Sequence, residues 1–79
     1  MIVSLKGGED MTNKKLTMKA IRINANLTQQ ELADAMGVSR ASVIAWETGK
    51  TKISTVCLMA FCYVTNVTID DISLPNWST

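Results

Sequence analysis

The chain has 79 residues with one proline and a formal net charge of +1, and 47% of its residues are hydrophobic while only 5% are aromatic. This length and composition fit one compact domain with a helical core of aliphatic side chains, rather than a β-sandwich. No apolar stretch reaches the roughly 18 residues of a membrane span, and the first ten residues lack the apolar run of a secretion signal, so no membrane partner is expected.

The N-terminal segment, residues 1–11, differs from the rest of the chain. Lys6-Gly7-Gly8-Glu9 interrupts any periodic pattern, and a second methionine stands at Met11. The codons of Lys-Gly-Gly can form a bacterial ribosome-binding sequence at a natural distance from the Met11 codon. We favour the interpretation that Met11 is the biological start and that residues 1–10 are an upstream extension. The alternative is a native N-terminal arm, and the intact mass of the native protein distinguishes the two.

Helical periodicity begins at residue 12. Met18, Ile21 and Ala25 recur at the spacing of one helix face and predict the first helix. Thr28 and Glu31 have the spacing of a capping box, which predicts the start of a second helix.

A turn is predicted where the second helix meets the third. Gly37 can adopt the left-handed conformation that closes a helix, and Val38 supplies an apolar anchor. Ser39 is a typical N-cap for the third helix, and Ala33 is small enough for two helices to cross closely. Residues 28–50 are therefore predicted to form a helix-turn-helix.

The fourth predicted helix, at about residues 54–65, is apolar on nearly every side. Residues 68–72 are predicted as a short fifth helix with acidic side chains in its first turn. Cys57 and Cys62 are five residues apart, which turns them away from each other and prevents a disulfide within the helix. We interpret them as two reduced thiols in a cytoplasmic protein.

Many residues of this region occur together at spacings that are typical of one family. They are Arg22, Leu27–Gln29, Glu31–Ala33, Gly37–Ser39, Trp46–Glu47, Gly49–Lys50 and Asn66–Asp70. On these residues the chain resembles the phage-repressor (Cro and lambda-repressor-like) helix-turn-helix family over about residues 15–72. The resemblance implies an all-α, compact five-helix domain that binds operator DNA, usually as a homodimer, with its third helix in the major groove. We expect this domain at residues 12–73, with a tail at residues 74–79.

In that family the outward face of the third helix reads the base edges. Val43, Trp46 and Glu47 are predicted to point inward, and the outward face comprises Arg40, Ala41, Ile44 and Ala45. Arg40 can donate two hydrogen bonds to guanine or contact a phosphate, and both uses stay open. The two alanines suit thymine methyl groups or simply permit close approach. Ile44 is either a thymine-methyl contact or a packing residue.

Phosphate contacts are expected around this face. Gln29, at the start of the second helix, resembles the family's phosphate-contacting glutamine. Further expected phosphate contacts are Ser39, Ser42, Thr48, Lys50 and Lys52. If about five phosphates are neutralised per subunit, log K falls with log salt at a slope of about −4.5.

Arg22 and Glu47 carry a different expectation. The family places an arginine of the first helix against a glutamate that closes the third, in a partly buried ion pair. The resemblance implies that this pair orients the recognition helix and that removing one partner costs about 3–5 kcal/mol. The alternative is two independent surface charges.

The fourth helix departs from the family's pattern. Thr55 and Thr65 stand where the family usually buries leucine, and Ile53 replaces a common proline, so a less rigid loop is expected there. The fourth helix is therefore either rotated or carries an extra apolar surface, which would suggest a partner. We predict a homodimer interface from the fourth and fifth helices. Its residues are Val56, Met59, Ala60, Tyr63, Val64 and Trp77.

An enzyme is not predicted. The chain has no histidine and only two cysteines, and no nucleophile with a base beside it is recognisable, so neither a metal nor a cofactor is expected. The main alternative to a DNA-binding repressor is an antitoxin or anti-repressor that holds another protein through the apolar fourth helix. The low net charge and the two alanines on the reading face favour this alternative.

Overall fold

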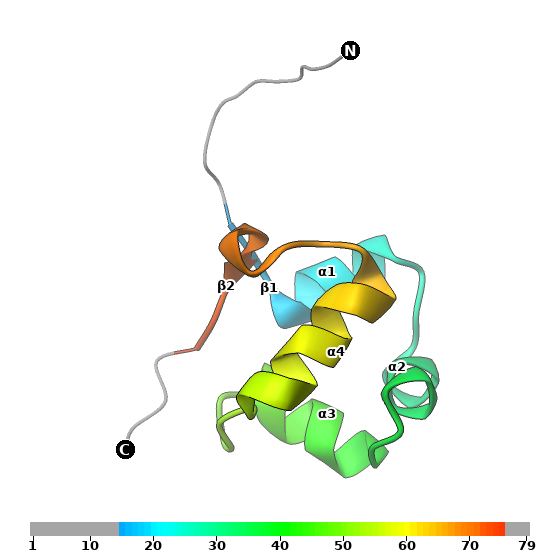
Figure 1. The fold of residues 1–79 in the computed structure, drawn as a ribbon. Helices are drawn as coiled ribbons and strands as arrows, with labels where there is room; N and C mark the ends of the chain where they lie inside the picture. The colour runs from blue at the N-terminus through cyan, green and yellow to red at the C-terminus, as the bar shows by residue number, and fades with distance from the viewer. Residues whose placement is uncertain (1–14, 76–79) are drawn as a thin grey trace.

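Four α-helices surround the core in the computed structural model, which describes residues 15–75 (Figure 1). The helices are α1 (Met18–Asn24), α2 (Gln29–Met36), α3 (Arg40–Glu47) and α4 (Thr55–Thr65). A 3₁₀ turn, η2 (Ile69–Asp71), follows α4, and two short strands are β1 (Leu16–Thr17) and β2 (Ile72–Ser73). The predictions for residues 1–11 and for Trp77 lie outside the described residues.

Each α-helix begins at a serine or threonine whose hydroxyl oxygen accepts a hydrogen bond from a backbone N–H of the first turn. The four caps are Thr17, Thr28, Ser39 and Ser54. At α2 the predicted capping box is confirmed, because Thr28 Oγ1 accepts from Glu31 N at 3.0 Å and Glu31 Oε1 accepts from Thr28 N at 2.8 Å. Such caps satisfy backbone donors that the helix itself leaves unpaired, and they fix where each helix starts.

The turn between α2 and α3 has the predicted conformation. Gly37 ends α2 at φ 73°, in the left-handed region, and its N–H returns to the last turn of the helix. The N–H of Val38 donates to the carbonyl of Ala33 at 3.0 Å, and the Val38 side chain packs against the core. The helix-turn-helix therefore has its geometry from one glycine and one apolar anchor.

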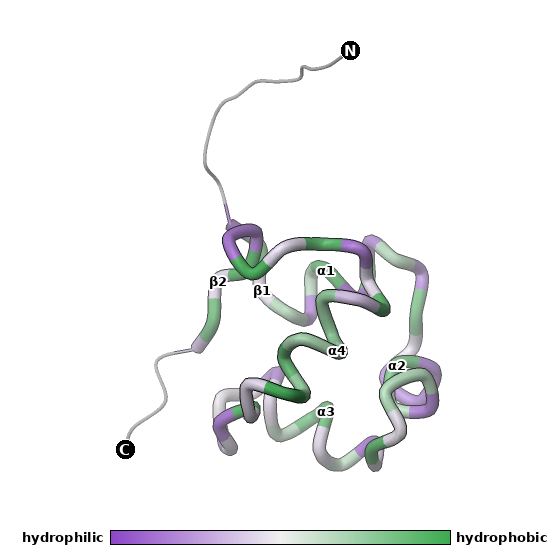
Figure 2. The backbone as a smooth tube through the Cα atoms, in the orientation of Figure 1, coloured by the Kyte–Doolittle hydropathy of each residue, from purple (hydrophilic) through white to green (hydrophobic). Residues whose placement is uncertain are grey.

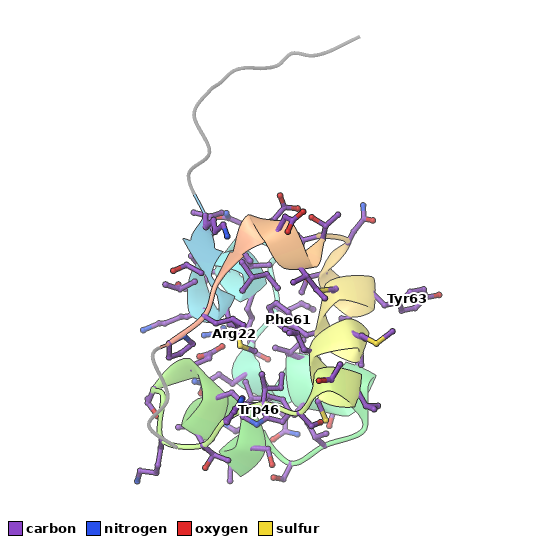
Figure 3. All side chains as sticks on the ribbon, turned by 60° about the vertical axis from the view of Figure 1, so that its left-hand side comes forward. Arg22, Trp46, Phe61 and Tyr63 are labelled. Carbon is purple, nitrogen blue, oxygen red and sulfur yellow. The ribbon has the colours of Figure 1, made fainter. Side chains whose placement is uncertain are left out.

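The core lies where α1, α2, α3 and α4 meet. Its buried hydrophobic residues are Met18, Ile21, Leu32, Ala33, Val43, Trp46, Ile53, Phe61 and Ile72. Figure 3 shows Phe61 and Trp46 pointing into the interior from α4 and α3. Ala33 and Val43 are fully buried where α2 and α3 pack together, so the small side chain of Ala33 lets the two helices approach closely.

The predicted count of five helices is not confirmed, and further details at the ends of the domain differ from the predictions. The predicted fifth helix is a single 3₁₀ turn, because the chain becomes extended at the buried Ile72 and pairs with Leu16. The two strands form a parallel pair, so the described fold is mostly helical rather than purely α. The first helix starts only at Met18, where Thr17 caps it. Ala25, predicted on its apolar stripe, is the exposed C-cap.

Helix α4 has two apolar faces, which decides between the two alternatives for it. One face is anchored by the fully buried Phe61, and the other exposes Val56, Met59 and Tyr63. Figure 2 shows the hydrophobic colouring along this helix, and in Figure 3 Tyr63 points away from the domain. Val64, predicted on the outer face, is half-buried and packs against the core. The helix therefore carries an extra apolar surface, which we call the α4 face (Val56, Met59 and Tyr63).

Candidate nucleic-acid interface

The outward side of α3 is uncovered by the rest of the described chain. Val43 and Trp46 anchor its inner side in the core, and Ser39 caps its start, with Oγ accepting from Ser42 N at 3.1 Å. On the outer side Arg40 and Ala41 are exposed, Ile44 is 37% exposed, and Ala45 is half-buried. All the predicted base-reading residues therefore share one face of a firmly anchored helix.

Three of these residues form the floor of an open hollow. Ala41, Ile44 and Ala45 line it, with Thr48 and Lys50 at the C-terminal end of α3. The Thr48 hydroxyl donates to the carbonyl oxygens of Ile44 at 2.9 Å and Ala45 at 3.3 Å. Its proton is thus used inside the helix, which leaves a surface with little hydrogen-bonding capacity.

A second hollow, whose lining residues all have polar or charged side chains, lies where the starts of α2 and α3 face each other. It is lined by Arg22, Thr28, Gln29, Gln30 and Arg40. The Gln29 side chain spans it, since Nε2 donates to Glu47 Oε1 at 3.2 Å and Oε1 accepts from Arg40 Nη2 at 3.5 Å. Sequence reasoning assigned Gln29 to phosphate alone, and no signal in the sequence indicated that it also links Glu47 to Arg40.

An ion pair between α1 and α3 lies behind this hollow. Arg22 Nε donates to Glu47 Oε2 at 2.6 Å and Nη2 donates to Glu47 Oε1 at 3.3 Å, with both side chains less than a tenth exposed. Arg22 Nη1 also donates to the carbonyl of Leu27 at 2.9 Å. A bidentate pair of this kind fixes direction as well as distance. It joins α1, the loop after it, and the end of α3 into one hydrogen-bonded cluster (Figure 3 labels Arg22).

Cationic side chains stand at both ends of the outer face of α3. Arg40 is its first residue, and the exposed Lys50 and Lys52 follow its last turn. Among the remaining expected phosphate contacts, Ser39 and Ser42 are within hydrogen-bond distance of each other, with their hydroxyl oxygens 3.0 Å apart. An apolar centre between flanking positive charges can meet a polyanion whose interior is partly apolar.

Residues 15–75 give little support for a metal site, a membrane span or a catalytic thiol. No group of three His, Cys, Asp or Glu side chains there could hold a metal ion, and no helix there is long and apolar enough to cross a membrane. Cys57 and Cys62 are free and half-buried. Burial raises the pKa of the Cys62 thiol, and the negative charge of Asp71 raises it further, so this thiol is poorly suited to act as a nucleophile.

The match to known families agrees with this geometry. Residues 18–72, which contain all four α-helices, the 3₁₀ turn and Ile72, match the family described as Helix-turn-helix. No curated protein matches the chain. The family match covers well over half of the chain, including the paired helices α2 and α3 and the residues on which the resemblance was based. The chain therefore belongs to the Cro- and lambda-repressor-like helix-turn-helix family and is a DNA-binding transcription regulator.

Proposed function

We propose that the chain is a sequence-specific repressor of bacterial or phage type that inserts α3 into the major groove of an operator as a homodimer. The observation that carries this proposal is the way in which α3 is held in the domain. Its inner side is fixed by the core and by the Arg22–Glu47 pair, while its outer side is open and has cations at both ends. The proposed compartment is the cytoplasm, where the two thiols stay reduced.

The proposal divides the residues into two roles. Arg40 donates to a guanine edge at the start of α3, while Ala41, Ile44 and Ala45 lie against the neighbouring bases. The contacts that position the domain on phosphates come from the backbone N–H groups at the start of α2 and from the polar residues around α3. These are Gln29, Ser39, Ser42, Lys50 and Lys52; Thr48 is left out because its hydroxyl and its N–H both donate to carbonyls of its own helix.

Selection of binding sites from random duplexes by the full chain tests the proposal. We expect enrichment of a palindrome, because a symmetric dimer reads two equal half-sites. Arg40→Ala then weakens binding to that duplex by about 5- to 150-fold, the equivalent of one good base contact. The matched control is Lys19→Ala, which removes an exposed cation from α1, away from both hollows. Failure to enrich any duplex contradicts the proposal.

The proposed dimer interface is centred on the α4 face. Val56, Met59 and Tyr63 are 77%, 59% and 88% exposed and recur at the spacing of one helix stripe. Ala60 and Val64 flank them, and Trp77 completes the proposed interface. Light scattering at micromolar concentration should give twice the chain mass, and Tyr63→Glu should give the monomer. Ile23→Glu, at an exposed apolar position of α1, is the control that should stay dimeric.

The α4 face also supports a second candidate function, an antitoxin or anti-repressor that binds another protein. The exposure of three large apolar side chains on one helix favours it. The two candidates differ in what Tyr63→Glu does. It removes binding to the partner protein in this second case, whereas in the first it removes the homodimer. A monomer that enriches no duplex supports the second candidate.

A further inference from the structure

The hollow on α3 is built almost entirely from carbon. Its floor is the side chains of Ala41, Ile44 and Ala45, none of which has a hydrogen-bonding group. Thr48 contributes a hydroxyl whose proton is donated to the helix's own carbonyls. Lys50 is the one remaining lining residue, and it brings an ammonium donor. Whatever lies against this floor is recognised by shape and apolar contact.

The base edges in the major groove differ in how favourably they can contact such an apolar surface. Thymine presents a C5-methyl group beside its O4 acceptor, whereas guanine, adenine and cytosine present polar atoms that need a partner and no methyl group. A polar edge pressed against Ile44 loses its water without gaining a hydrogen bond, which disfavours it. The same floor therefore attracts a methyl group and rejects the other edges.

Charge indicates that the occupant is DNA and not an apolar protein segment. Arg40 precedes the hollow in the sequence, Lys50 is one of its lining residues, and Lys52 follows shortly after, so positive charge brackets it along the chain. The α4 face, by contrast, has no charged residue anywhere in Thr55–Thr65. Phosphates on either side of the groove complement the first arrangement and not the second.

Resting on the proposed function, we infer that the hollow reads thymine methyl groups and that Ile44 determines this specificity. Ala41 and Ala45 are four residues apart, so the floor extends about 6 Å along the helix axis. Base pairs are about 3.4 Å apart, and the floor thus spans about two neighbouring steps. Arg40 sets the register at a polar position on one side, and the hollow requires thymine at the next positions.

Removing methyl groups from the DNA tests this inference without altering the protein. The probe is the duplex enriched by the full chain, with single thymines replaced by uracil, and binding is measured by fluorescence anisotropy at fixed salt. At each contacted position the uracil duplex should bind about fourfold more weakly, the value of one buried methyl-sized group. A 5-methylcytosine·guanine pair at the same position should bind more tightly than unmethylated cytosine·guanine.

Protein variants then assign the effect to Ile44. In Ile44→Ala the ratio of the affinities for the thymine and uracil duplexes should fall towards one. In Ile23→Ala, which changes an exposed isoleucine of α1, this ratio should stay at about fourfold. Ile44→Asn supplies an amide that can pair with adenine, so its preference should move from thymine to adenine at that position. Thermal melts of the variants check that each one is folded before binding is measured, and Ile44→Val serves if Ile44→Ala melts early.

The possible results separate this inference from the proposed function. A chain that enriches a duplex but binds its uracil and thymine forms equally overturns the thymine inference and leaves the repressor intact. An undiminished uracil penalty in Ile44→Ala overturns the role of Ile44. If no duplex is enriched at all, the proposed function fails and the inference fails with it.

Discussion

The outer face of α3 and the α4 face are both open surfaces of one small domain, yet they are built differently. The α3 face has an apolar centre with cations at both ends, and a hydrogen-bonded cluster fixes the helix from behind. The α4 face is apolar over its whole length and has the fully buried Phe61 on its opposite side (Figures 2 and 3). The first therefore fits a charged polymer, and the second fits another apolar surface.

The difference shows how one small domain of this 79-residue chain can keep two helix faces open. Each of these helices packs only one side against the core, and the opposite side is exposed and could contact a partner. What distinguishes the partners is the charge around the free side, because both free sides contain large apolar residues. The proposed base reading requires a fixed position of α3, whereas an apolar contact tolerates small shifts. The buried ion pair accordingly acts on α3 and not on α4.

The largest expected effect is loss of the ion pair. Glu47→Ala leaves the Arg22 guanidinium buried without its carboxylate, so the free energy of unfolding should fall by about 3–5 kcal/mol. Tyr63→Ala, at the 88% exposed position of the α4 face, should stay within about 0.5 kcal/mol of the parent. Urea denaturation followed by circular dichroism measures both, under conditions where the chain is monomeric.

A double variant separates the pair from its surroundings. Arg22→Met with Glu47→Met removes both charges and keeps apolar volume, so it should recover much of the stability that Glu47→Ala loses. A loss below about 1 kcal/mol in Glu47→Ala would mean that the two side chains behave as surface charges. In that case the contrast between a fixed α3 and an unconstrained α4 face would not stand.

Much of this fold follows from local signals. The hydroxyl caps at Thr28 and Ser39, the glycine at the turn and the small Ala33 each have a strong physical reason that involves only nearby residues. The β1–β2 pair does not, because two-residue strands have no periodicity and Leu16 meets Ile72 only after the helices have packed. The prediction of a fifth helix at residues 68–72 differs from the structure for a similar reason, because a tertiary contact limits its length. Thr68 N donates to Asp71 Oδ2 at 2.9 Å, which closes a turn whose length the burial of Ile72 then limits.

The candidate site also has one part that local sequence predicts and another part that depends on tertiary packing. The inward and outward sides of α3 could be predicted because Val43 and Trp46 fix its rotation. The link from Glu47 through Gln29 to Arg40 could not, since it joins side chains from two helices whose mutual placement is a tertiary property. For α4, an all-apolar composition made periodicity uninformative, and only burial separates Phe61 from Tyr63.

The next effect concerns the avidity of the proposed dimer. Tyr63→Glu places a charge in the α4 face and should weaken binding to the selected palindrome by about 100-fold or more, because two linked half-sites bind with avidity. Binding to an isolated half-site should not change, since Tyr63 lies on α4 and lines neither of the two hollows beside α3. Tyr63→Phe keeps the apolar ring and is the matched control. Equal weakening on palindrome and half-site would contradict an assembly role for this face.

A smaller effect should appear in the salt dependence. Lys50→Ala and Lys52→Ala each remove one expected phosphate contact, so the slope of log K against log salt should become shallower by about 0.9 per subunit for each. The change should be similar for selected and random duplexes, because phosphate contacts carry no sequence information. Lys19→Ala, which removes an exposed cation of α1 away from both hollows, should leave the slope unchanged. Titration of a labelled duplex at several salt concentrations provides the slopes.

The smallest effect is expected at Cys62, on the inner side of α4. Burial, and secondarily Asp71, raise the pKa of this thiol, so the folded state favours its protonated form. The stabilisation is present in full below the ordinary pKa of cysteine and is lost as the pH rises through the raised value in the folded chain. Cys62→Ala should therefore lose less stability than the parent over that alkaline range.

Alkylation gives an independent measure of the same raised pKa. In a Cys57→Ser background, iodoacetamide should react with Cys62 more slowly in the folded chain than in urea, and the midpoint of its rate against pH should lie higher. Asp71→Asn removes the secondary cause and should move that midpoint slightly down, while burial keeps it above the value in urea. Identical midpoints in the folded and unfolded chain would show that the inner side of α4 is open to water. The contrast between its buried and exposed sides, on which the proposed dimer depends, would then be lost.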